Sequence, residues 1–173
     1  MRRLPGPRPL LVLLLSALAL DPLATPAPAA GPEGEAVKRL VVTLPFDEAE
    51  LIVRAEAQRQ NLNLVNVLDI QKGMENRGGT FKPYKVLQFC NLELGIQIYA
   101  DLPEAGAFQL CGVLLYEPTP GRTVLVSARQ SWVLRALAAS RPAPAAQDAA
   151  RRFERIIDEI FEAVAEEARA RRR

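Results

Sequence analysis

The two cysteines, Cys90 and Cys111, are the side chains of this sequence best suited to chemistry. The 173-residue chain has no histidine, which excludes Ser-His-Asp and Cys-His nucleophiles and zinc sites that require imidazole. It also lacks a glycine-rich phosphate loop. Thiol chemistry is therefore the redox-capable chemistry that the sequence offers. Whether the protein is an enzyme stays open, with a non-enzymatic protein without a cofactor favoured.

Several interpretations of the cysteine pair stay open. A structural disulfide between Cys90 and Cys111 would close a loop of about twenty residues and stabilise the domain by roughly 3 kcal/mol. A reactive, redox-sensing Cys90 is the second, because Asn91 is a good N-cap and the positive end of a helix dipole lowers a thiol pKa. Cuprous copper held by both cysteines and Met74 is the third, since thiolate and thioether ligands suit that ion. Two free buried thiols are the fourth.

The N-terminus has the features of a secretory signal peptide. Two arginines precede an apolar run from Leu10 to Leu20, and the small residues Ala27 and Ala29 suit signal peptidase. The run is too short to anchor the chain in a bilayer. We therefore expect residues 1–29 to be removed and the protein to be secreted to the periplasm, an oxidising compartment in which paired thiols form disulfides.

Removal of this segment leaves a protein without net charge. The full chain has 22 basic and 20 acidic residues. Three of the basic residues and one acidic residue lie in the segment (Arg2, Arg3, Arg8 and Asp21), which leaves 19 of each. Nucleic-acid binding depends on many lysine and arginine contacts to phosphates, so we expect no nucleic-acid partner.

Periodicity predicts one domain over residues 30–140. Alternating or continuous apolar residues predict five strands over Val37–Leu44, Asn61–Ile70, Tyr84–Cys90, Leu110–Glu117 and Arg122–Ser127. Helical spacing and capping residues predict three helices over Phe46–Gln60, Leu92–Leu102 and Ser131–Ser140. The order β-α-β-β-α-β-β-α predicts an α+β fold, a two-layer sandwich with the helices on one face of the sheet.

Three segments carry more specific expectations. Asn61–Ile70 is expected to be buried on one face and partly on the other, and Leu110–Glu117 to be an interior strand covered on both faces. Gln71–Pro83 is expected to be the longest loop, and loops of this kind often carry function. We expect a ligand or partner to meet this loop and the strand ends that carry the cysteines, with Asn91, Met74 and Lys85 on that surface.

The C-terminus is expected to form a separate helix over residues 148–173, after a Pro/Ala linker over residues 141–147. Its large apolar residues recur at helical spacing and must dock on something. Its own domain or a second copy could cover this apolar face. We expect self-association or a protein partner to use the face. The acidic residues of the helix disfavour membrane contact. The residues concerned are Phe153, Ile156, Ile157, Ile160, Phe161 and Val164.

The cysteine region resembles the domain of unknown function 302 family. The resemblance lies in Phe89-Cys90-Asn91, a following helix, and Leu110-Cys111 before a hairpin, and it covers roughly Val37 to Leu137 without the linker and the terminal helix. It implies a compact α+β fold, often dimeric, and no established activity. The chain has Leu92 and Gly112 where many members have proline.

These observations together predict an exported small binding or accessory module whose ligand or partner is unknown. A thiol redox protein or sensor that uses Cys90 and Cys111 is the alternative. A copper-binding protein is the second alternative.

Overall fold

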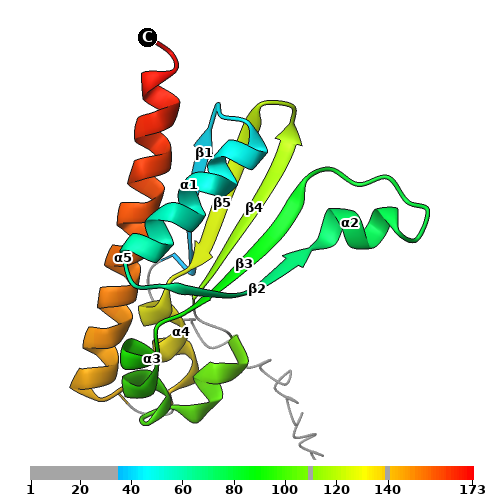
Figure 1. Cartoon of the computed structure of the whole chain (residues 1–173). Coiled ribbons are helices and arrows are strands. Elements are labelled where there is room, and N and C mark those ends of the chain that lie inside the picture. Colours follow the sequence, from blue (N-terminus) through cyan, green and yellow to red (C-terminus); the bar gives the residue numbers. More distant parts are fainter. Residues whose placement is uncertain (1–34, 109–110, 139–140) are drawn as a thin grey trace, which may run out of the picture. The chain divides into compact units, whose positions relative to one another are not determined.

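The computed structural model describes residues 35–108, 111–138 and 141–173, so the predicted signal peptide lies outside the described residues. Figure 1 shows the arrangement of the elements. The strands are β1 (Val37–Val42), β2 (Asn63–Asp69), β3 (Tyr84–Cys90), β4 (Gly112–Thr119) and β5 (Arg122–Ala128). The helices are α1 (Phe46–Arg59), α2 (Ile70–Glu75), α3 (Leu92–Tyr99), α4 (Gln130–Leu137) and α5 (Pro144–Ala170), with a 3-10 helix η1 (Pro103–Phe108).

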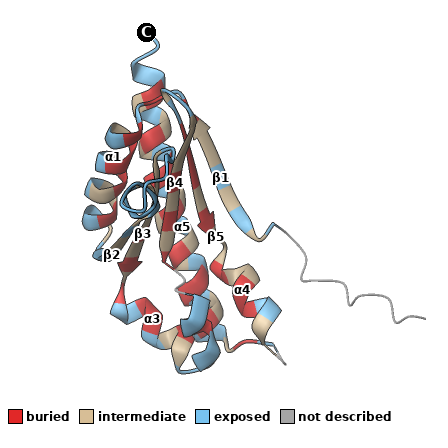
Figure 2. Ribbon diagram, turned by 90° about the vertical axis from the view of Figure 1, so that its right-hand side faces the viewer, coloured by how far each residue is buried: buried red, intermediate tan, exposed pale blue. Residues whose placement is uncertain are grey.

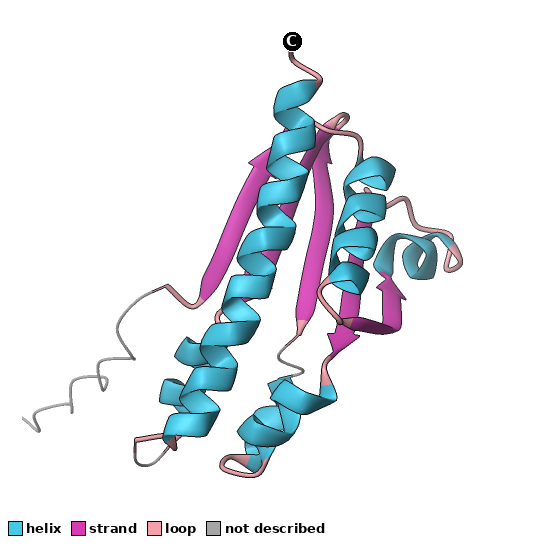
Figure 3. Ribbon diagram, turned by 60° about the vertical axis from the view of Figure 1, so that its left-hand side comes forward, coloured by secondary structure: helices cyan, strands magenta, loops and turns pink. Residues whose placement is uncertain are grey.

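The strands form one antiparallel sheet in the order β1-β5-β4-β3-β2. Helices α1 and α5 pack on each other and on the sheet, along the same face (Figure 3). Sheet residues that share the core cluster with these helices, such as Leu87, Leu115 and Leu125, are fully buried. Figure 2 shows buried residues in red along β4 and β5. This arrangement of helices on one face of a sheet confirms the predicted α+β class.

Helix α1 begins where the sequence predicted. Pro45 precedes its first turn, which carries the acidic Asp47 and Glu48 that suit the positive end of the helix dipole. One face presents small residues to the core, with Ala49 and Ala57 fully buried. Small side chains on that face let the helix lie close to the sheet and to α5.

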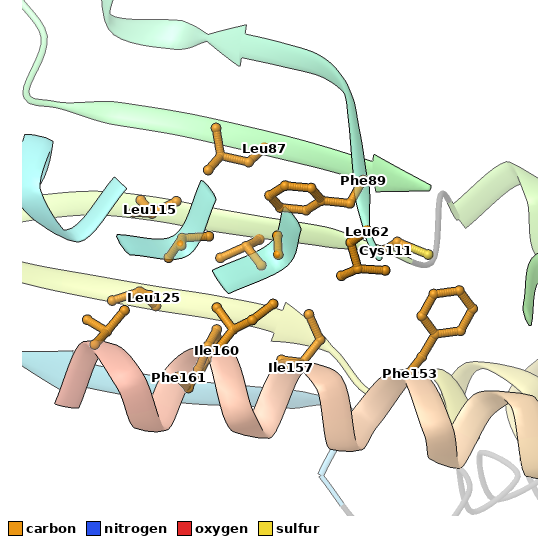
Figure 4. Packing of buried hydrophobic residues seen from close by; sticks show 14 of the residues in the cluster. Leu62, Leu87, Phe89, Cys111, Leu115, Leu125, Phe153, Ile157, Ile160 and Phe161 are labelled. Atoms are coloured by element: carbon orange, nitrogen blue, oxygen red, sulfur yellow. The ribbon is translucent and has the colours of Figure 1, made fainter. Parts of the chain in front are cut away.

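Helix α5 is part of the domain core, which corrects the prediction of a separate element. It begins at Pro144, inside the expected linker, and runs to Ala170. Its apolar side chains point toward the sheet (Figure 4). Phe153, Ile157, Ile160, Phe161 and Val164 are buried in the same cluster as the strand residues, and Ile156 packs against that cluster.

These residues are consequently not available as a surface for a second copy or a partner. Of the two ways to cover this face, packing on the chain's own domain is the one observed. Self-association as such stays a prediction. None of the helices within the described residues is long and apolar enough to cross a membrane.

The segment around β2 differs from the prediction in two respects. β2 is an edge strand, and Leu64, Val65 and Leu68 are exposed, so the expected burial of this strand was wrong. The expected loop begins with the short helix α2, whose N-cap Asp69 accepts a hydrogen bond from the Lys72 backbone N–H at 2.9 Å. β4 is interior as predicted, but its second face is only partly buried.

Candidate functional site

The two cysteines share a pocket with a volume of about 470 Å³. The pocket lies where β3 ends, α3 and η1 pass, and β4 begins. We call it the cysteine pocket, and its lining includes Val65, Cys90, Leu92, Ile96, Tyr99, Gly106 and Cys111.

The strand register explains how the cysteines reach this pocket. The backbone N–H of Phe89 donates to the carbonyl oxygen of Cys111 at 2.9 Å, so Cys111 lies beside Phe89 and Cys90 is one residue further along β3. Phe89 and Cys111 are both buried, on the side of the sheet that faces the helices (Figure 4). Cys90 is half-buried.

Both cysteines are free thiols in the structure, so the predicted disulfide is not formed in it. The reason lies in the same register. Successive side chains of a strand point to opposite faces, and Cys111 is aligned with Phe89 rather than with Cys90.

Asn91 caps α3, as predicted. Its side-chain oxygen accepts a hydrogen bond from the Leu94 backbone N–H at 3.1 Å, and its amide nitrogen donates to the Asn61 carbonyl oxygen at 3.2 Å. The side chain is buried, with both polar atoms engaged. Asn91 therefore positions the pocket wall, and because it is among the residues that line the pocket, its place on a ligand surface stays a prediction.

The thiol of Cys111 is poorly suited to ionise. Burial, and then the neighbouring Cys90, raise the pKa of Cys111 to about 12, although a backbone hydrogen bond with Asn91 opposes the shift. Burial also raises the pKa of the Tyr99 hydroxyl, and both cysteines add to that shift. At neutral pH the pocket therefore presents an uncharged Cys111 thiol and an uncharged Tyr99 hydroxyl.

This shift predicts an alkaline loss of stability. A raised pKa means that folding favours the protonated thiol, so its contribution is complete below the ordinary pKa of 9.0 and is lost as pH rises toward about 12. Between pH 9 and 11 the free energy of unfolding should fall by about 2–3 kcal/mol because of Cys111. Urea unfolding of the wild type and Cys111→Ala at both pH values measures the difference. Parallel losses in the two proteins would contradict this role.

Met74 does not join the cysteines, which corrects the predicted three-ligand copper site. It lies on α2, which follows Asp69. In the β2–β3 register Asp69 pairs with Lys85, at the opposite end of β3 from Cys90, which pairs with Asn63. Within the described part of the chain, no group of three histidine, cysteine or acidic side chains is arranged to hold a metal ion.

Lys85 lies at that opposite end too and belongs to a partly buried ion-pair network. Its ammonium group is 2.8 Å from one carboxylate oxygen of Glu50 and stands over the Phe46 ring. The other oxygen of Glu50 accepts two hydrogen bonds from Arg54. Burial raises the pKa of Glu50, but the hydrogen bonds from Lys85 and Arg54 outweigh burial and lower it. Lys85 is therefore a structural residue of the core edge, not part of a surface at the cysteines.

The rim of the cysteine pocket is apolar and exposed, a feature that the sequence did not reveal. Leu92, Ile96 and Val65 are 80%, 67% and 62% exposed. Helix α3 has apolar residues on nearly every side, and Leu94 and Ile98 are the ones that enter the core. The sequence carries one signal for this rim. Leu94 and Ile98, four residues apart, pack α3 onto the core, so the further apolar residues of the helix indicate another role.

Comparisons with known proteins agree with this architecture. No curated protein matches the sequence. A crystal structure described as an uncharacterized conserved protein DUF302 from Bacillus stearothermophilus is similar in fold, with a TM-score of 0.66 and 14% sequence identity over 76% of this chain and 99% of that one. The family model "Domain of unknown function DUF302" matches residues 38–160, so it extends into α5, beyond the predicted limit at Leu137. Because this match covers most of the sequence, the chain belongs to the DUF302 family.

Proposed function

We propose that this protein is an exported binding module that takes a small apolar molecule into the cysteine pocket. The observation that carries the proposal is the exposed aliphatic rim, in which Leu92, Ile96 and Val65 surround a hollow instead of entering the core. Exposed apolar groups gathered around a concavity are typical of ligand sites. The signal-like N-terminus supports export, and N-terminal sequencing of secreted protein beginning near Ala30 would test it.

The lining indicates an uncharged ligand. No charged side chain is among the described residues that line the pocket. The polar residues of its lining are Gln88, Cys90, Asn91, Tyr99 and Cys111. A volume of about 470 Å³ falls in the range of small-molecule sites. A charged ligand would lose its hydration there without a counter-charge.

Filling the pocket from its own wall tests the proposal. A side chain at Gly106 has room, because a Cβ there would meet only the edge of Tyr99, at 4.0 Å, and Gly106→Leu would project into the pocket. We expect this variant to lose at least about tenfold in affinity for an apolar fluorescent probe such as N-phenyl-1-naphthylamine. Fluorescence titration measures the loss.

Gly73→Leu is the matched control. Gly73 lies on α2, outside the cysteine pocket, with nothing within 4 Å of an added Cβ. This variant adds the same apolar side chain to the surface and should bind the probe like the wild type. Equal affinities of Gly106→Leu and Gly73→Leu, with unchanged unfolding midpoints, would exclude the pocket as the binding site.

A thiol redox function is the second candidate, favoured by the presence of two mutually influencing thiols in one pocket. In this reaction a disulfide reagent would accept two electrons and two protons and be reduced to two thiols. The S–H bonds of Cys90 and Cys111 would be replaced by one S–S bond. Treatment with oxidised glutathione should then remove both titratable thiols without leaving bound glutathione. Stable mixed disulfide at Cys90, with Cys111 still free, would rule out this pairing.

A further inference from the structure

We propose that a second hollow, formed by α4 and the start of α5, binds a doubly charged oxyanion of the phosphate-monoester class. This hollow has a volume of about 450 Å³. We call it the arginine cleft, and its polar lining consists of Ser131, Arg135, Arg141, Gln147, Arg151 and Glu154. It shares no lining residue with the cysteine pocket, so this site is independent of the proposed apolar ligand.

Three arginines from three segments of the chain line the cleft. Arg135 comes from the end of α4, Arg141 from the segment before α5, and Arg151 from the second turn region of α5. Guanidinium groups bind phosphate oxygens through paired N–H donors, and groups that converge from different directions suit a tetrahedral anion.

The two residues that follow Arg141 are held in place by contacts with two parts of the chain. The Gln147 side-chain amide donates to the Pro142 carbonyl oxygen, which ties the segment to α5. The backbone N–H of Ala143 donates to a carboxylate oxygen of Asp101 at 2.8 Å, which ties it to the residues after α3. Pro142 is buried between these contacts. The position of Arg141 is therefore restricted before any ligand binds, which lowers the entropy lost on binding.

The charge of the lining is strongly positive. The lining contains three arginines and one carboxylate, that of Glu154. That carboxylate has a structural role, because one of its oxygens accepts hydrogen bonds from the Ser131 backbone N–H at 2.8 Å and from the Ser131 hydroxyl at 2.7 Å. In a chain whose 22 basic and 20 acidic residues nearly cancel, this surplus is local.

The carboxylate of Asp148 would compete only weakly with a bound anion for Arg151. Its carboxylate is 3.6 Å from the Arg151 guanidinium, and both side chains are about half exposed. Ion pairs of this kind contribute little free energy. A phosphate group that contacts several guanidinium groups would therefore displace Asp148 from Arg151, and removal of this carboxylate should strengthen binding.

Isothermal titration of the full mature protein with inorganic phosphate tests the proposal. We expect binding at concentrations below about 10 mM, at least about tenfold weaker in Arg151→Gln and unchanged in Arg155→Gln. Arg155 is an exposed arginine on the same helix, outside the lining, and controls for loss of one positive charge. Asp148→Asn should bind as tightly as the wild type or more tightly.

Four results would overturn the proposal: no phosphate binding by the wild type, equal weakening by Arg151→Gln and Arg155→Gln, weaker binding by Asp148→Asn, or equally tight binding of succinate, which would remove the preference for phosphate. Gly106→Leu separates this site from the cysteine pocket, since it should lose the apolar probe and keep phosphate.

Discussion

A chain that ends at residue 140, before α5, should show no cooperative unfolding transition. Helix α5 supplies Phe153, Ile157, Ile160, Phe161 and Val164 to the core, and each is at most 3% exposed. Burial of one such side chain stabilises a protein by about 1.5–3 kcal/mol, so their sum reaches the whole stability of a typical domain. Urea denaturation followed by circular dichroism measures the loss.

Single substitutions give the same test in graded form. Ile160→Ala should lower the free energy of unfolding by about 2–5 kcal/mol, because Ile160 is fully buried and its truncation leaves a cavity. Ile96→Ala, at an exposed position of α3, should change it by less than about 0.5 kcal/mol. A truncated chain that unfolds cooperatively with the wild-type midpoint would show that α5 is an accessory element.

Glu50→Ala should destabilise the protein by about 3 kcal/mol, the second large effect that we expect. The Glu50 carboxylate forms ion pairs with Arg54 and Lys85, and the residue is only 8% exposed. Its removal leaves two cations at the core edge, with Asp69, at 3.9 Å from Lys85, as a poor substitute. Urea unfolding at pH 7 measures the loss.

The contribution of Glu50 to the free energy of unfolding should depend on pH. Because the pKa of Glu50 is lowered in the folded state, its stabilising contribution is present above the ordinary pKa of 4.5 and is lost as pH falls through the lowered value. The difference in the free energy of unfolding between wild type and Glu50→Ala should therefore shrink in acid.

Glu56→Ala is the control: it removes an exposed ion pair with Arg59 and should lower the free energy of unfolding by less than about 1 kcal/mol. A loss no larger in Glu50→Ala than in this control would contradict the network.

The secondary structure that could be predicted is the part determined by neighbouring residues. The alternation in Tyr84–Cys90 correctly predicted a strand, in which the alternate residues Leu87 and Phe89 are buried. Asn91 correctly marked the start of α3. Both depend on local geometry: side chains alternate along a strand, and a side-chain cap acts within three residues.

The parts that could not be predicted depend on contacts between distant segments. The apolar face of α5 required a cover, but only the three-dimensional structure shows that the cover is the chain's own sheet and helix α1. Similarly, Met74 and Lys85 lie on or beside the expected functional loop, yet the β2–β3 register places them away from Cys90. The exposed rim residues Leu92 and Ile96 have the same sequence character as core residues, so their role depends on which side of α3 packs inward.

Mapping the bound probe by solution NMR tests the central claim most directly. In 15N-labelled mature protein titrated with N-phenyl-1-naphthylamine, the amide shifts should change at Val65, from Cys90 to Tyr99, and at Gly106. They should stay constant in α2 and in the arginine cleft. Shifts that centre on another surface, or that persist in Gly106→Leu, would show that the cysteine pocket is not the binding site.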